Sequence, residues 1–336
     1  MTSSEKQGRS GCFWSAMIAL VLILLISVAA NVGLLFGLAM MADPDRVRTA
    51  RPEDEYPDFR ERWSYGKGEV RAVRIPLSGI IVRDGAAGLF PRPDKVEQTL
   101  RQIRAAINDE NMRAIILELD SPGGAVTPCD EIYHALTRFR ESREDRRVLI
   151  FTRDINASGA YYLSMAGDWI MTEPTAILGA IGVMIQSINF QELSERIGVR
   201  DTTIRSGERK DILNPFREVT PEDRKLLQDL VDSMFGRFSD IVREGRGLTD
   251  GQMAFIADGR IMTAETALNA GMIDEIGYWE DAVERTADLL GVDEVKVIRY
   301  YRRPDFFERL AHMTHPLDIR AWLDASTPRV MYLWRP

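Results

Sequence analysis

The sequence predicts an α/β fold preceded by a membrane-spanning helix, and two observations lead to this. From about residue 70 onward, short apolar runs alternate with stretches of helical periodicity, which is typical of βα units. Between Arg9 and Asp43 the chain has no charged residue. With 336 residues, 45% of them hydrophobic, the chain can bury one large core or two small ones.

Charge and cysteine usage exclude several classes of protein. The net charge is −8 and no basic patch with interleaved aromatics is present, so we expect no nucleic-acid partner. The two cysteines, Cys12 and Cys129, form no Cys/His cluster, so neither a structural zinc site nor an internal disulfide is expected. Cys129 is expected to be a small buried hydrophobe. The sequence indicates no metal and no other cofactor.

The N-terminal region predicts an uncleaved membrane anchor. A short polar segment, residues 1–12, precedes the apolar residues 13–41. About 20 apolar residues span the hydrocarbon core of a bilayer, and this stretch is longer than the apolar region of a signal peptide. The alternative is cleavage after residues 27–29, which resemble a small-residue cleavage site. Basic residues lie on both sides of the anchor, so charge alone leaves its orientation open.

Three further segments follow the anchor. Residues 43–69 are highly charged, contain three prolines and have no apolar period, so they are expected to form a solvated stalk. Residues 70–290 carry the βα pattern and form the main expected folded domain. Residues 291–336 are rich in aromatics and are expected either to pack on the chain's own core or to contact another copy.

The elements of the folded part follow from apolar runs and helical periodicity. The expected strands are 70–82, 114–119, 148–151, 169–172 and 202–205. The expected helices are 94–109, 129–142, a segment from Ser158, 189–198, a long helix from Thr220, 263–274 and 279–291. Thr220 and Pro221 stand where an N-cap and first helical residue belong. The alternation predicts a largely parallel sheet.

Ser158 lies in "INASGAYYLSMA" at the junction of an expected strand and an expected helix. An N-cap is the ordinary use of serine at such a position. The alternative is a nucleophile at the C-terminal edge of the sheet, where the positive helix end favours developing negative charge. Small neighbours, Ala157, Gly159 and Ala160, would then let a substrate backbone approach.

Two other turns could line the same crevice. "DSPGGAV" (120–126) follows a strand, and Gly123 and Gly124 leave bare amides that can point outward, as an oxyanion hole requires. The amide of Gly159 is a second candidate. "ILGAIGVM" (177–184) is another turn of small residues. For the "PGG" turn, a plain tight turn remains the alternative.

Lys210 in "SGERKDILNPF" (206–216) is the candidate base. The chain contains six lysines and 37 arginines, so a lysine in a motif is informative. Lysine can act as a base when burial favours its neutral form, whereas arginine keeps its proton in proteins. The alternative is a solvent-facing loop lysine beside Glu208 and Asp211.

Together, "DSPGG", "ASGAYY" followed by "GAIGV", and "RKDILNPF" resemble the motifs of the signal peptide peptidase A family of membrane-anchored serine proteases, in its short, single-copy form. The resemblance covers about 70–290, with the motifs in the family's order and 52 residues from Ser158 to Lys210. It implies a ClpP/crotonase-like fold of repeated ββα units with a helical C-terminal part. It also implies that Ser158 is the nucleophile, Lys210 the general base, and Gly123 and Gly124 ligands of the substrate backbone or oxyanion.

The resemblance further implies an extracytoplasmic catalytic domain and a homo-oligomeric ring, in which a lysine can serve the serine of a neighbouring subunit. The chain departs from the family pattern at Ala180, where "LGAIG" replaces the usual "TGSIG" and loses a hydroxyl that helps hold the lysine. Either another hydroxyl, from Ser187, Thr203 or Ser206, would take over the role of holding the lysine, or activity would be lower. Asn156 replaces a small apolar residue and is expected to tighten the turn or contact substrate.

The sequence thus predicts a membrane-anchored endopeptidase that works through an acyl-enzyme on hydrophobic, membrane-proximal peptides such as remnant signal peptides. Two alternatives stay open. The same fold carries acyl-CoA chemistry, against which the membrane anchor counts. A non-catalytic, oligomeric membrane scaffold is the other, with Ala180 as the mark of a weakened site.

Overall fold

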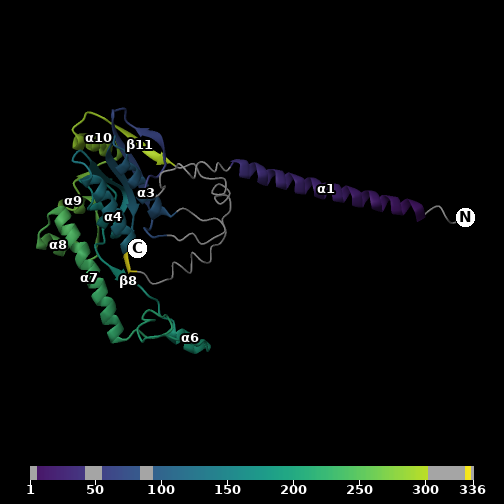
Figure 1. Cartoon of the computed structure of the whole chain (residues 1–336). Helices are drawn as coiled ribbons and strands as arrows, with labels where there is room; N and C mark the ends of the chain where they lie inside the picture. The colour runs from purple at the N-terminus through teal and green to yellow at the C-terminus, as the bar shows by residue number, and fades with distance from the viewer. Residues whose placement is uncertain (1–5, 42–54, 84–93, 302–329, 334–336) are drawn as a thin grey trace. The chain divides into compact units, whose positions relative to one another are not determined.

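The computed structural model describes residues 6–41, 55–83, 94–301 and 330–333 (Figure 1). The chain divides into two units, residues 1–53 and 54–336. The first unit contains helix α1 (Lys6–Met41). Its segment Met17–Leu34 has a mean hydropathy of 2.7 and is long enough to cross a membrane. The expected N-terminal apolar helix is therefore confirmed, and it fits a single-pass anchor.

The second unit is built on a mixed sheet with the strand order β1-β11-β2-β3-β5-β6-β10. Its central strands are parallel: β2 (Val70–Ser78), β3 (Met112–Ser121), β5 (Arg147–Ala157) and β6 (Trp169–Thr172). They are connected by helices α3 (Lys95–Asn108), α4 (Val126–Glu141) and α5 (Gly159–Ser164). The βα alternation expected from the sequence is confirmed. Strands β3 and β5 read as continuous apolar runs because both faces of the sheet are covered.

Strands that the sequence did not predict complete the sheet at its edges. Strand β1 (Arg60–Tyr65) lies in the segment expected to be stalk, and β11 (Val295–Tyr301) lies in the segment expected to be an extension. They pair with each other antiparallel, and β11 pairs parallel with β2. As an edge strand, β1 is largely exposed and so lacks the apolar run that would have identified it. At the opposite edge, β10 (Glu275–Ile276) pairs with β6.

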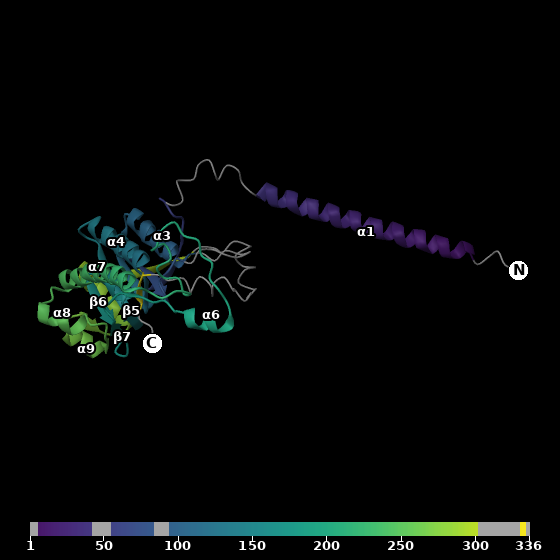
Figure 2. The same ribbon diagram turned by 90° about the horizontal axis from the view of Figure 1, so that it is seen from below.

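Helices cover both faces of the sheet (Figures 1 and 2). The larger core lies between the sheet and α3, α4, α5 and α7 (Pro221–Arg246). The smaller core is closed by α10 (Trp279–Leu290), whose Trp279 packs edge-on against Phe151. Caps fix where these helices begin: Asp94 accepts from the N–H groups of α3, and Thr220 accepts from Asp223 in α7, as its position before Pro221 predicted.

Residues 186–220, called the arm below, follow strand β8 (Met184–Ile185) and lead to the start of α7 (Figure 1). The arm carries helix α6 (Gln191–Ile197). The expected strand at 202–205 is wrong: this stretch has no strand partner, and the Ile204 side chain is 99% exposed. The three β-branched residues at 202–204, which favour strands, therefore misled the prediction. After α7 the chain forms α8 (Asp250–Ile256), β9 (Ile261–Thr263) and α9 (Ala264–Asn269).

A second, small sheet lies beside the ends of the parallel strands. It has the order β4-β12-β8, where β4 is Gly123–Ala125 and β12 is Val330–Leu333. Both pairings of β12 are antiparallel. Strand β7 (Ile177–Gly179) belongs to the main sheet, where it pairs with the last residues of β5 and with β9.

Candidate active site

Ser158 is held in an unusual backbone conformation where β5 ends and α5 begins. Its φ is 54° and its ψ is −118°, in a region that a residue with a Cβ atom adopts only at a cost of about 1–3 kcal/mol. Its N–H donates to the carbonyl of Gly179 at 2.8 Å, which ties the residue to β7. Its side chain makes no capping hydrogen bond to α5. The N-cap alternative therefore does not account for the hydroxyl.

The Ser158 hydroxyl is enclosed by small residues. Only 2% of the residue is exposed, and Oγ lies 3.5 Å from the carbonyl oxygen of Gly182, at the outer limit of a hydrogen bond. Ala157 and Ala160 are fully buried, so their small size also serves packing beneath the turn. Gly159 is the first residue of α5, and its N–H therefore has no acceptor inside the helix.

The glycine pair serves two different purposes. Gly123 has φ +97°, which a glycine adopts without strain, and its N–H donates to the Ser121 hydroxyl at 3.0 Å. A Cβ on Gly124 would lie 1.9 Å from the carbonyl oxygen of Ile81, which bridges to Gly124. The bare backbone of Gly124 is thus required by a neighbouring segment of the same chain, a reason the sequence did not indicate.

The third turn also lies at the serine. Gly179 has φ +107°, and a Cβ there would approach the Arg260 carbonyl oxygen to 2.6 Å. Ala180, which replaces the expected hydroxyl residue, has φ 50° and donates its N–H to the same carbonyl at 2.6 Å. The structure therefore brings the three turns expected from the sequence together around Ser158.

The C-terminal strand β12 lies between two of these turns. Tyr332 is opposite Gly124, and Met331 is opposite both Ala125 and Met184. The carbonyl of Gly123 and the N–H of Ala125 both bond to Ile81, so the N–H and carbonyl of Gly124 face the other way, toward β12. The gap between β4 and β8 is therefore a slot that accepts an extended strand.

Lys210 is not brought to Ser158 within a single chain. Its side chain is exposed on the arm, and its N–H donates to the Gly207 carbonyl at 3.1 Å. Among the residues that the structure describes, Lys210 and Ser158 form no hydrogen bond with each other.

The side chains proposed to orient Lys210 are also on the arm. Ser187, Thr203 and Ser206 are exposed, and the Thr203 hydroxyl donates to Asp201 at 2.7 Å. In the described part of the chain none of the three bonds to Lys210. Asn156 is fully buried, and its Nδ2 donates to the Ser164 hydroxyl at 3.0 Å, which itself bonds to the Ala160 carbonyl. This favours its expected role in fixing the turn.

Three features of the site were missed from the sequence: the Gly182 carbonyl, the Ser121 hydroxyl and strand β12. The signal for β12 was the apolar run "VMYL" (330–333) inside the aromatic-rich C-terminal segment. The Gly182 and Ser121 contacts depend on backbone geometry at tight turns, which composition does not encode.

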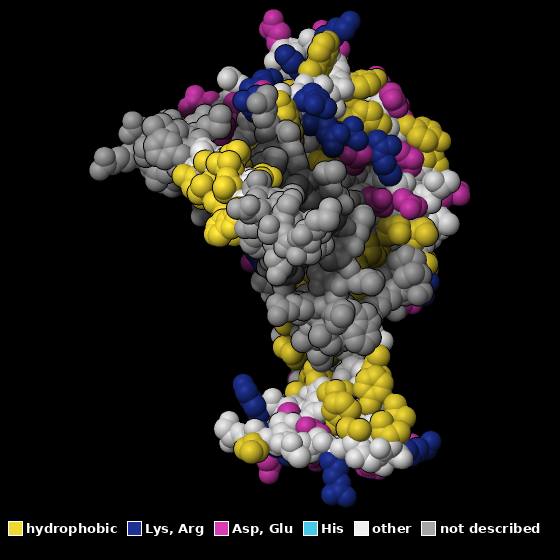
Figure 3. Space-filling model, turned by 90° about the vertical axis from the view of Figure 1, so that its right-hand side faces the viewer, with side chains coloured by type: hydrophobic (Ala, Val, Ile, Leu, Met, Phe, Trp, Pro, Cys, Tyr) yellow, Lys and Arg dark blue, Asp and Glu magenta, His cyan; other side chains and the backbone are white. Residues whose placement is uncertain are grey.

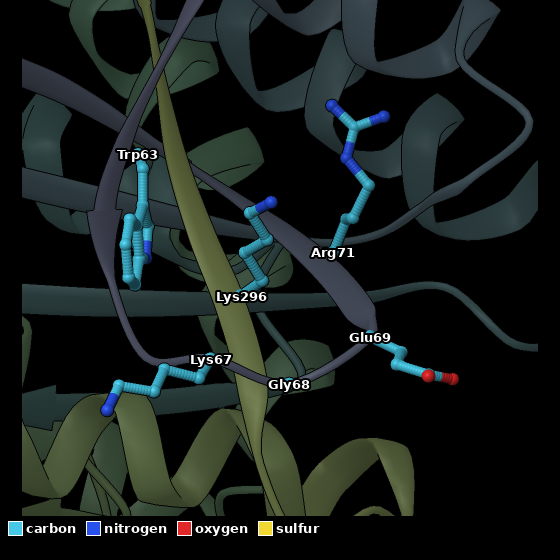
Figure 4. Close-up of a pocket in the computed structure, with 6 residues that line it drawn as sticks. All are labelled: Trp63, Lys67, Gly68, Glu69, Arg71 and Lys296. Carbon is cyan, nitrogen blue, oxygen red and sulfur yellow. The ribbon is translucent and has the colours of Figure 1, made fainter.

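No group of three or more metal-ligating side chains occurs in the described ranges. A shallow pocket elsewhere lies at the turn between β1 and β2, next to the start of β11 (Figure 4). It is lined by Trp63, Lys67, Gly68, Glu69, Arg71 and Lys296. These residues lie where β2 and β11 begin, whereas Ser158 follows the end of β5. Because β11, β2, β3 and β5 are parallel, this pocket lies at the N-terminal ends of the strands, whereas Ser158 lies at their C-terminal ends.

A strained serine at the C-terminal end of a parallel strand, beside bare glycine turns and a slot for an extended peptide, is the arrangement expected of a serine hydrolase on an α/β fold. The comparisons with known proteins narrow this class. The model of peptidase family S49 matches residues 140–293, which include Ser158 and Lys210.

Among similar proteins, a putative signal peptide peptidase SppA of Enterococcus faecium is 31% identical over 236 residues, covering 70% of this chain and 68% of that protein. A putative protease of Synechocystis is 38% identical over 191 residues, covering 57% of this chain and 68% of that protein. Protease 4 of Salmonella typhi is 28% identical over 208 residues, covering 62% of this chain and 33% of that protein. The chain belongs to the signal peptide peptidase A family and is a serine peptidase.

Proposed function

We propose that this protein is a membrane-anchored endopeptidase in which Ser158 is the nucleophile and Lys210 the general base. The observation that carries the proposal is the conformation of Ser158: a buried, uncapped hydroxyl held at positive φ where β5 meets α5. Strain of this kind persists only where the surrounding structure fixes it, and it concentrates at functional sites. The resemblance of "RKDILNPF" to the family's lysine motif supports the role of Lys210.

The reaction proceeds through an acyl-enzyme. Neutral Lys210 takes the proton from Ser158 Oγ as that oxygen attacks the peptide carbonyl, and the leaving amine then receives the proton. Water activated by the same lysine hydrolyses the ester and frees the serine. No cofactor takes part in either step.

The Gly159 N–H is the better candidate for binding the oxyanion. It begins α5 without an intrahelical acceptor and follows the nucleophile directly, so it lies where negative charge develops. The Gly123 N–H is bonded to Ser121 Oγ and would have to exchange this partner before it could bind the oxyanion.

The substrate is an extended peptide that lies in the slot between β4 and β8. Strand addition of this kind supplies main-chain hydrogen bonds without demanding one sequence. Helix α1 would hold the catalytic unit beside a bilayer, on its extracytoplasmic side. The substrates would therefore be hydrophobic peptides close to the membrane, such as remnants of signal peptides.

Lys210 is proposed to act on Ser158 of a neighbouring copy in a homo-oligomeric ring. A lysine acts as a base when it is removed from water, and Lys210 is exposed on the single chain. The arm that carries it presents a large apolar surface, visible on the lower lobe in Figure 3. Its exposed side chains are Ile188, Phe190, Leu193, Ile197, Val199, Ile204 and Phe216, called the arm patch below. Docking of this patch on a second copy would bury both the apolar surface and the lysine.

Labelling with a serine-directed phosphonate tests the nucleophile and the base. We expect the full-length protein in detergent to react, Ser158→Ala to lose the label, and Lys210→Met to label far more slowly with its fold intact. Full peptidase activity in both variants would refute the dyad.

Mixing the two inactive variants tests which copy supplies the lysine. In a ring, a Lys210→Met subunit contributes Ser158 and a Ser158→Ala subunit contributes Lys210. Random mixing in equal amounts should then restore about a quarter of the wild-type activity, because about one interface in four pairs an intact serine with an intact lysine. If each copy used its own lysine, the mixture would stay inactive.

A further inference from the structure

Three polar side chains from three helices contact one another at α5, the helix that follows Ser158. Tyr162 lies one turn along α5 from Ser158, and its hydroxyl donates to Asp130 of α4. Arg237 of α7 donates to the same Asp130 oxygen at 2.7 Å and to the Tyr162 hydroxyl at 3.2 Å. Each member therefore contacts both of the others.

The environment fixes which group donates and which accepts. Tyr162 is fully buried, with the rings of Tyr133 and Phe238 edge-on at 5.4 and 5.3 Å. Burial alone would raise the pKa of Asp130, but the bonds from Arg237 and Tyr162 outweigh it and hold that pKa below its ordinary value. Burial and the neighbouring Asp130 carboxylate raise the pKa of Tyr162. The network is therefore a carboxylate that accepts from a phenol and a guanidinium throughout the neutral range.

The three helices correspond to three parts of the proposed site. Helix α5 begins after Ser158, α4 follows the glycine strand β4, and α7 begins at Pro221, where the arm that carries Lys210 returns to the body. Arg237 lies 16 residues beyond Pro221, which is about 24 Å along the helix. If α7 tilted by about 5° about Arg237, its first residue, where the arm ends, would move by about 2 Å. A misplacement of about 1 Å is enough to slow catalysis about 100-fold.

We propose that Asp130, Tyr162 and Arg237 form a positioning network. The network fixes the direction of α7, and with it the position of the arm that carries Lys210, relative to α5. This inference rests on the proposed function, in which Lys210 is the base. It holds whether the lysine serves its own serine or that of a neighbouring copy, because either geometry depends on the direction of α7.

Tyr162→Phe tests the network by removing one hydroxyl and keeping the ring. The matched control is Tyr161→Phe, on the same helix and equally buried, whose hydroxyl donates to the Met272 carbonyl at 2.8 Å. We expect both variants to lose a similar amount of thermal stability. Only Tyr162→Phe should lower kcat, by about 10- to 100-fold with KM changed less than about twofold. Equal kcat values for the two variants would overturn the proposal.

A double variant shows whether the effect passes through the lysine. In Lys210→Met, adding Tyr162→Phe should not slow phosphonate labelling of Ser158 any further. An additional fall equal to that in the wild-type background would mean that Tyr162 acts on the serine turn directly, which contradicts the network's proposed role. If Lys210→Met itself keeps full activity, the proposed function fails. If Lys210→Met is inactive while Tyr162→Phe is fully active, only the positioning role fails.

Discussion

Leu333, in the C-terminal strand, lies opposite Gly123 in the antiparallel ladder between β12 and β4, and it is almost fully buried there. Strand β12 also contacts α5, the helix that begins directly after Ser158. The chain therefore places one of its own strands in the slot where an extended peptide substrate is proposed to bind.

If β12 and substrate use the same slot, weakening β12 should increase the rate on added peptides. Tyr332→Pro removes the N–H of the residue opposite Gly124, with Tyr332→Phe as the control that keeps the backbone unchanged. A tethered segment competes at an effective concentration in the millimolar range, so we expect kcat/KM on a long hydrophobic peptide to rise about 2- to 10-fold. Initial rates at low substrate concentration measure this. A fall in activity would instead mean that β12 supports the structure of the site and does not compete with substrate.

Gly124 should not tolerate a side chain, because a Cβ would lie 1.9 Å from the backbone oxygen of Ile81. We expect Gly124→Ala to lower the free energy of unfolding by about 3 kcal/mol. The control is Gly236→Ala in α7, where the added methyl group meets no atom of the described residues within 4 Å beyond its own helix backbone and chain neighbours. Helix propensity should raise the stability of this variant by about 0.5–1 kcal/mol. Denaturant unfolding of the two variants should shift in opposite directions. Equal stability of Gly124→Ala and wild type would contradict the close approach of Ile81.

The sequence predicted the central strands and the serine turn well because both depend on local patterns. Apolar runs such as 114–119 and 148–151 are buried on both faces, and the structure extends each of them into a longer strand. Strand β1 escaped prediction because an exposed edge strand needs no apolar side chains, only a partner, β11, that lies more than 200 residues away. Long-range pairing of this kind leaves little trace in composition.

The candidate site was predictable in its residue types and less so in its geometry. "SPGG" and "ASGAYY" indicated bare turns, but the reason for Gly124 is the carbonyl of Ile81, which no motif records. The turn position of Ser158 and the rarity of lysine made Ser158 and Lys210 candidates, and the family resemblance assigned them the roles of nucleophile and base. Lys210 is exposed on the arm of a single chain, so the proposed dyad requires either a second copy of the chain or movement of the arm.

Glu118 should make the fold sensitive to acid. Its carboxylate accepts from Arg74 at 2.6 and 2.7 Å and from Arg153 at 2.6 Å. Burial alone would raise the pKa of Glu118, but the two arginines outweigh it and hold the pKa below the ordinary value of 4.5. The native state therefore keeps Glu118 ionised at a lower pH than the unfolded chain does, so its stabilisation is present above pH 4.5 and is lost as pH falls through the native pKa.

Glu118→Gln should remove this acid dependence. At pH 7 we expect the variant to lose about 2 kcal/mol, since hydrogen bonds to charged groups contribute about that much. Between about pH 5 and about pH 3 its free energy of unfolding should fall less steeply than that of wild type. Urea unfolding across a pH series measures both quantities. Parallel curves for the two proteins would show that other carboxylates control the acid response.

The arm patch should control assembly, because a large contiguous exposed apolar patch is rare on a monomer and typical of an interface. Ile204 is 99% exposed, so Ile204→Glu removes apolar contact surface without disturbing the described core. We expect sedimentation velocity in detergent to show a shift from oligomer to monomer, with peptidase activity lost in parallel and the melting temperature of the catalytic unit retained.

Leu268→Glu on α9, a 37% exposed apolar position on the body, is the matched control and should keep both assembly and activity. If Ile204→Glu dissociates the oligomer and activity survives, Lys210 serves the serine of its own chain. An intact oligomer in that variant would place the interface elsewhere on the surface.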